Sequence, residues 1–156
     1  MKKRIIAVFL VLAVPLTAVS CSKTCPKVTG PNDVTYAAVT APQCFPFGDY
    51  VVNTPSEFVS YCTGTDFASA TSAPSSWNFT DKTYAVYSYG YFSGSLVPYV
   101  AGVGNSTTDS DTIVITIGHP SSCGKPVTAD AGSITLAFEF AKTAKTIVFQ
   151  EKDEAE

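Results

Sequence analysis

Large apolar side chains recur at every second residue in several stretches of this chain, and this period of two restricts the possible folds more than any other feature. The clearest examples are Ile113, Ile115 and Ile117 in residues 112–118, and Ile134, Leu136, Phe138 and Phe140 in residues 133–143. Such alternation is typical of β-strands with one buried face. With the turn residues between such runs, it predicts about seven strands, at 33–39, 49–53, 83–92, 96–103, 112–118, 133–143 and 145–151. We therefore expect a mainly β fold, built as an antiparallel sheet, a small sandwich or a barrel.

One short helix is expected early in the chain, at residues 55–62. Thr54 is a good N-cap residue, Pro55 suits the first helical position, and Glu57 completes a capping box. Phe58 and Cys62 belong to the apolar face that follows.

The first twenty residues are predicted to be an export signal and not part of the fold. Three basic residues are followed by an apolar run that is shorter than the ~20 residues of a membrane-spanning helix. Small residues then precede Cys21, where a lipoprotein signal peptidase requires a thiol that carries lipid. We expect a lipoprotein signal peptide over residues 1–20 and lipidation, with palmitate among the acyl chains, at Cys21. Cleavage after Ser20 by a general signal peptidase would instead give an unlipidated secreted protein.

The cysteine count supports lipidation of the first thiol, because an odd cysteine in an exported protein needs an explanation. If Cys21 carries lipid, Cys25, Cys44, Cys62 and Cys123 remain and form two disulfides. Three pairings are possible. Cys44 and Cys62 flank one strand–helix unit, which favours the pairs Cys44–Cys62 and Cys25–Cys123. There is no C-x-x-C motif, so no metal site is expected, and nothing in the sequence indicates a cofactor.

The expected organisation is a signal peptide over 1–20, a tether over 21–32, one β-rich domain over 33–150 and a solvated acidic tail over 151–156. Removal of the signal peptide would leave seven basic against thirteen acidic residues. This balance excludes a nucleic-acid-binding function. It also excludes electrostatic attraction to anionic lipid, so the acyl chains would supply the membrane contact.

The candidates for catalysis are few. His119 is the only histidine, and no G-x-S-x-G motif frames a serine nucleophile for it. Asp109 and Asp111 lie in an expected hairpin tip but lack the glycine and the bidentate glutamate of an EF-hand loop. We therefore expect no catalytic residues, and a hydrolase using His119 or this tip is the alternative.

Tyrosines crowd two neighbouring predicted strands. Residues 83–92 place Tyr84 on one face and three further tyrosines on the other. Tyrosine gives a large contact area at low cost in rotamer freedom, so we expect a binding surface that includes Tyr84, Tyr87, Tyr89, Tyr91 and Tyr99. Cross-strand packing inside the sheet is the alternative.

The order of these elements resembles the PrcB C-terminal-like domain. The segment "GDYVVNTPSEFVSYC" is similar to the strand and helix that open that domain. "NFTDKTYAVYSYGYF" is similar to its next strand, and "TIVITIG…SITLAFEFAKTAKTIVFQ" to its closing strands. The resemblance implies a bacterial envelope lipoprotein that supports the assembly of a surface serine-protease complex, and it implies no catalytic residues.

Together these features predict a lipid-anchored protein of the bacterial cell envelope, periplasmic or surface-facing, with a non-catalytic binding or assembly-supporting domain. Its expected partners are the membrane, through the N-terminal lipid, and an envelope protein or protease complex. The alternatives are a hydrolase using His119 and an unlipidated secreted structural protein.

Overall fold

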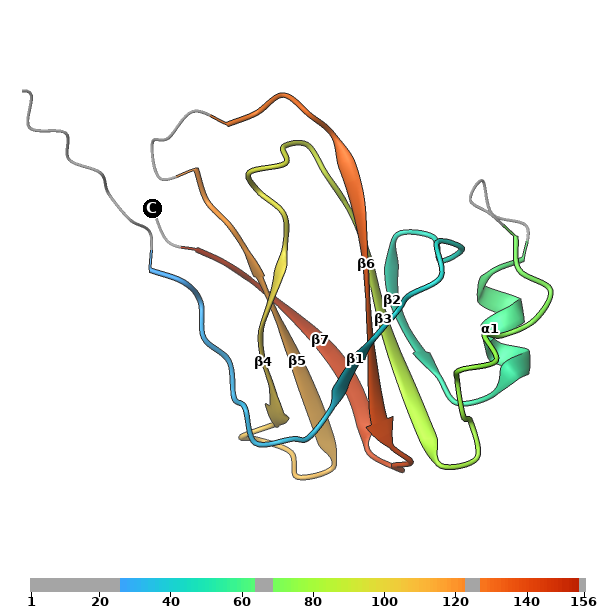
Figure 1. Cartoon of the computed structure of the whole chain (residues 1–156). Helices are drawn as coiled ribbons and strands as arrows, with labels where there is room; N and C mark the ends of the chain where they lie inside the picture. Colours follow the sequence, from blue (N-terminus) through green and yellow to red (C-terminus); the bar gives the residue numbers. More distant parts are fainter. Residues whose placement is uncertain (1–25, 64–68, 123–126, 155–156) are drawn as a thin grey trace, which may run out of the picture.

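The computed structural model describes residues 26–63, 69–122 and 127–154 (Figure 1). The predicted signal peptide, the predicted lipidation site Cys21 and the predicted pair Cys25–Cys123 lie outside these residues. No helix in the described part of the chain is both long and apolar enough to cross a membrane.

The protein is mainly β, as predicted, and consists of two facing sheets and one short helix (Figure 1). The four-stranded sheet has the order β1 (Ala37–Val39), β6 (Gly132–Ala141), β3 (Lys82–Tyr91), β2 (Gly48–Val52). The three-stranded sheet has the order β4 (Tyr99–Asn105), β5 (Thr112–His119), β7 (Thr146–Asp153). Among the described residues the two sheets stay separate and form no closed barrel.

One strand pair differs from the expected antiparallel arrangement. β5 and β7 run parallel, in a register from Thr112 opposite Thr146 to His119 opposite Asp153. Parallel neighbours need a crossover connection. Here the chain leaves β5, forms β6 in the other sheet and returns as β7.

The main core lies between the two sheets. The alternation predicted for β3, β5 and β6 is confirmed, because each strand turns one set of large side chains inward. The buried members of this core are Ala85, Tyr87, Val103, Ile113, Ile115, Ile117, Phe138, Phe140 and Ile147.

A second core covers the outer face of the four-stranded sheet. The helix α1 (Pro55–Tyr61) packs there through Phe58, whose ring meets Trp77 edge-on at 5.5 Å. Trp77 in turn stacks on Tyr84 at 4.2 Å between ring centroids. Since β3 therefore has packed side chains on both faces, it is the most buried strand of the sheet.

The ends of the helix follow the prediction closely. The backbone N–H of Glu57 donates to Oγ1 of Thr54 at 3.1 Å. The Glu57 carboxylate accepts from the N–H of Asn53, one residue before the cap. After the helix, Cys62 forms the predicted disulfide with Cys44, with 5.0 Å between the Cα atoms.

The segment before β1 lies across the three-stranded sheet and does not extend the first strand. The N–H groups of Gly30 and Val34 donate to backbone oxygens of β4, at 3.1 and 3.3 Å. A Cβ atom on Gly102 would lie 2.5 Å from the carbonyl oxygen of Pro31, so the two backbones touch. The predicted strand 33–39 is therefore reduced to Ala37–Val39. Within the predicted tether, residues 28–32 are held against the domain.

Candidate functional site

The segments 92–98, 119–122 and 127–131 lie at one end of the sandwich, which we call the loop end (Figure 1). There β3 and β5 finish and β4 and β6 begin. The opposite end carries the short hairpin turn between β4 and β5 and the turn between β6 and β7.

The loop end exposes large apolar side chains. Phe92 is 90% exposed, Phe47 56% and Val127 49%. Only one other large apolar residue in the described part of the chain is comparably exposed, Val148 at 38%. Large exposed apolar side chains gathered at one end of a folded protein mark interaction sites.

Two of these rings border a hollow of about 340 Å³, which we call the aromatic hollow. Its lining residues are Phe47, Tyr89, Gly90, Tyr91, Phe92, Ala131 and Gly132. A Cβ atom on Gly90 would lie 3.0 Å from the Phe47 ring, and one on Gly132 would lie 2.5 Å from the Tyr91 hydroxyl. The two glycines thus let both rings lie close against the strands, because they bring no side chain of their own.

The five tyrosines predicted as one surface are divided by the structure. Tyr84 and Tyr87 are at most 1% exposed, because both faces of β3 are covered, so these two side chains form no part of a binding surface. Tyr89 and Tyr91 line the aromatic hollow, whereas Tyr99 lines a different hollow. The alternative of packing inside the sheet is thus correct for Tyr84 and Tyr87.

Phe47 was not predicted as a site residue, and neither was the exposure of Phe92. The available signal was weak: Phe92 is the last residue of one predicted strand, Phe47 lies two residues before another, and turn residues adjoin both. In the structure, Gly48 of β2 pairs with Ser88 of β3. This pairing places residue 47 beside the end of β3, which the sequence alone does not show.

Behind the aromatic hollow lies a polar cluster that contains His119. The Tyr87 hydroxyl donates to Oε1 of Glu151 at 2.9 Å and lies 3.2 Å from Nε2 of His119. Oε2 of Glu151 lies 3.5 Å from the same nitrogen. The Tyr89 ring meets the imidazole edge-on at 4.8 Å, which connects this cluster to the hollow.

The cluster shifts the pKa of two neighbouring acids. Burial, and then the hydrogen bond to Glu151, raise the pKa of Tyr87, so its hydroxyl stays protonated and remains a donor. Desolvation, and then the charge of Glu151, raise the pKa of Asp49. The contact between the Tyr87 hydroxyl and Nε2 of His119 joins the two sheets. A hydrolase that uses this residue stays a prediction.

The two aspartates proposed as an alternative site lie at the opposite end of the sandwich. Oδ1 of Asp109 accepts from the N–H of Asp111 at 2.9 Å, and Oδ2 accepts from the hydroxyl of Thr112 at 2.7 Å. These two bonds lower the pKa of Asp109 and shape the turn into β5. Within residues 26–63, 69–122 and 127–154, no three His, Cys, Asp or Glu residues are placed to hold a metal ion.

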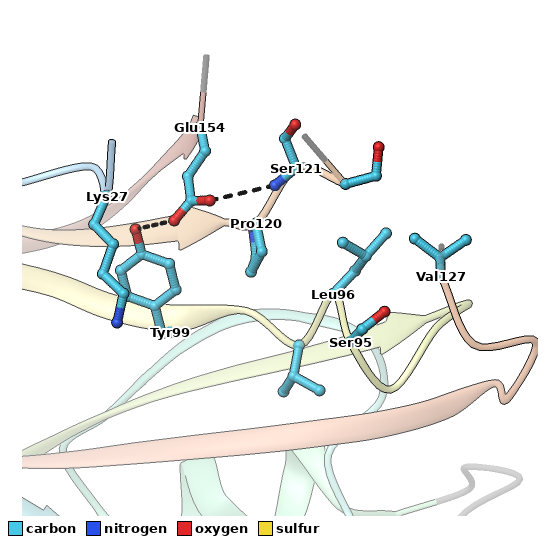
Figure 2. Close-up of a pocket in the computed structure, with 10 residues that line it drawn as sticks. Lys27, Ser95, Leu96, Tyr99, Pro120, Ser121, Val127 and Glu154 are labelled. Carbon is cyan, nitrogen blue, oxygen red and sulfur yellow. Dashed lines mark hydrogen bonds between the residues drawn. The ribbon is translucent and has the colours of Figure 1, made fainter. Parts of the chain in front are cut away.

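Tyr99 lines a second hollow, of about 460 Å³, at the loop end (Figure 2). We call it the Tyr99 hollow. The Tyr99 hydroxyl donates to Glu154 at 2.8 Å and accepts from the N–H of Val28 at 3.0 Å. Figure 2 shows Leu96 and Val127 across the hollow from this pair. The predicted acidic tail is thus partly structured, since β7 extends to Asp153 and Glu154 is bonded.

No protein-family model, no curated protein sequence and no solved structure matches this chain. The resemblance to the PrcB C-terminal-like domain therefore stays a prediction.

Proposed function

We propose that this chain is an exported, lipid-anchored protein of the bacterial cell envelope, and that its sandwich is a non-catalytic binding or assembly-supporting domain. The observation that carries the proposal is the aromatic hollow with Phe92, 90% exposed, at its rim. Burying a phenylalanine side chain is worth about 1.5–3 kcal/mol. A partner that covers the Phe92 ring would gain most of this free energy, and covering the half-exposed Phe47 ring would add to it.

The cysteines support the anchor. The structure pairs Cys44 with Cys62, which leaves Cys21, Cys25 and Cys123. We propose that Cys25 pairs with Cys123. Cys21, at the predicted cleavage site, is then the odd thiol and available for acylation. The attached lipid is the proposed membrane contact of the protein. An envelope protein or protease complex is its proposed protein partner.

The test places a photo-crosslinking amino acid at position 92 of the full chain, in bacteria that export it. The matched control carries the same amino acid at Ser110, which is exposed in the hairpin at the opposite end. We expect adducts with lipid or with a defined protein from position 92 and none from position 110. Exported, folded protein that gives no adduct from position 92 would contradict a binding role for the aromatic hollow.

A further inference from the structure

The described chain starts at the same end of the sandwich that exposes the large apolar residues. Nζ of Lys27 lies 5.5 Å from the centroid of the Tyr99 ring, and Lys27 lines the Tyr99 hollow together with Leu96 and Val127. Leu96 belongs to the connection that directly follows Phe92 and leads into β4. The N-terminal segment therefore joins the domain at the loop end.

The proposed anchor would hold this end close to the bilayer, and the inference rests on that part of the proposed function. The domain fixes the chain from Val28 onward, through the hydrogen bond to Tyr99. Seven residue steps separate this point from Cys21, and seven fully extended residues span at most about 25 Å. The opposite end lies farther away by the length of the strands. The longest strands have ten residues, which corresponds to about 33 Å.

The side chains at the loop end suit a lipid interface. Trp and Tyr gather at membrane–water interfaces, and Phe is among the apolar residues that interfacial segments bury at the boundary of headgroups and acyl chains. Phe92, Phe47 and Val127 together give this end an exposed apolar rim. The opposite hairpin, residues 106–111, consists of Ser, Thr and Asp only.

The charge at this end selects the kind of lipid. Among the described residues at or next to the loop end, the acids Asp130, Glu151, Asp153 and Glu154 outnumber the lysines Lys27 and Lys152. An acidic surface gains nothing from anionic headgroups, because membrane electrostatics favour basic segments. The contact would therefore be with neutral phospholipid.

We propose that the loop end is seated on the membrane that carries the anchor, with Phe92 inserted between neutral phospholipids and Phe47 and Val127 flanking it. The aromatic hollow is thus a lipid-contact site. The hairpin between β4 and β5 points away from the bilayer.

The test uses the acylated full chain in phosphatidylcholine vesicles, with tryptophan as a reporter. The native Trp77 is only 7% exposed and stacks on Tyr84, so its emission provides a constant background. The test variant is Phe92→Trp and the matched control is Ser110→Trp. Each is compared in vesicles with ordinary and with brominated acyl chains, and the acylation of each is checked by intact mass.

We expect the emission of Phe92→Trp to shift to shorter wavelength on insertion and to lose intensity in brominated vesicles. The emission of Ser110→Trp should show neither change. Acylated Phe92→Trp that emits as in water and resists brominated lipid would overturn the lipid contact and leave the anchor standing. A blue shift without quenching by brominated lipid would also overturn it, because protein then covers residue 92. A chain that carries no lipid at Cys21 would instead defeat the anchor in the proposed function.

Discussion

The hydroxyl of Tyr87 donates a hydrogen bond of 2.9 Å to Oε1 of Glu151, and this bond joins the central strand β3 of one sheet to the edge strand β7 of the other. Tyr87→Phe keeps the ring and removes the donor. We expect the free energy of unfolding to fall by about 1 kcal/mol. Chemical denaturation at pH 7 measures it. Tyr89→Phe is the control, since its hydroxyl bonds to no other described residue, and equal losses in the two variants would contradict the proposed role of the bond.

The disulfide between Cys44 and Cys62 closes a separation of 18 residues beside the helix. Replacing both cysteines by alanine should lower the free energy of unfolding by about 3 kcal/mol, because the unfolded chain regains the freedom of that loop. Denaturation without reductant measures the loss. With reductant present, the difference between the parent and the double variant should largely disappear. A difference that stays the same would assign the effect to packing of the two buried sulfur atoms.

The close contact between Gly102 and the segment before β1 predicts different outcomes for two glycine substitutions. In Gly102→Ala the new methyl meets backbone atoms of Gly30 and Pro31, so we expect a loss of about 1–3 kcal/mol. In Gly90→Ala the atoms nearest to the methyl belong to the Phe47 side chain and not to backbone, so the loss should stay below about 1 kcal/mol. Denaturation gives both values. Hydrogen exchange at the amides of Gly30 and Val34 should quicken only in Gly102→Ala, and unchanged exchange there would contradict the contact.

The raised pKa of Asp49 predicts a pH-dependent effect on stability. Its carboxyl binds a proton more tightly in the folded than in the unfolded state, where the pKa is about 3.9. Stability therefore falls as the pH rises from the unfolded pKa to the folded pKa, and the cost is complete above both. Asp49→Asn should gain less than about 1 kcal/mol at pH 7, because the site is partly solvated. Thermal unfolding from pH 3 to pH 8 checks this, and a gain that grows toward low pH would contradict the sign.

Local signals in the sequence predict most of the elements. Thr54, Pro55 and Glu57 place the helix start correctly, because capping depends only on neighbouring residues. The alternation around Ile115 and Phe138 identifies the inward faces of β5 and β6. The pair Cys44–Cys62 follows from elements that are neighbours along the chain.

What the sequence does not reveal depends on contacts between distant segments. The parallel pairing of β5 with β7 arises because β6 belongs to the other sheet, and no local pattern records this choice. The burial of Tyr84 follows from Trp77 and the helix covering a face that alternation alone leaves open. The exposure of Phe47 at the aromatic hollow depends on where the end of β3 lies.

The intact mass of the mature protein, purified from its own envelope before and after reduction, tests the central claim most directly. We expect a chain that starts at Cys21 and carries acyl chains, and in which four thiols appear on reduction, from Cys25, Cys44, Cys62 and Cys123. An unmodified chain cut after Ser20, with Cys21 as a free or intermolecular thiol, would contradict it.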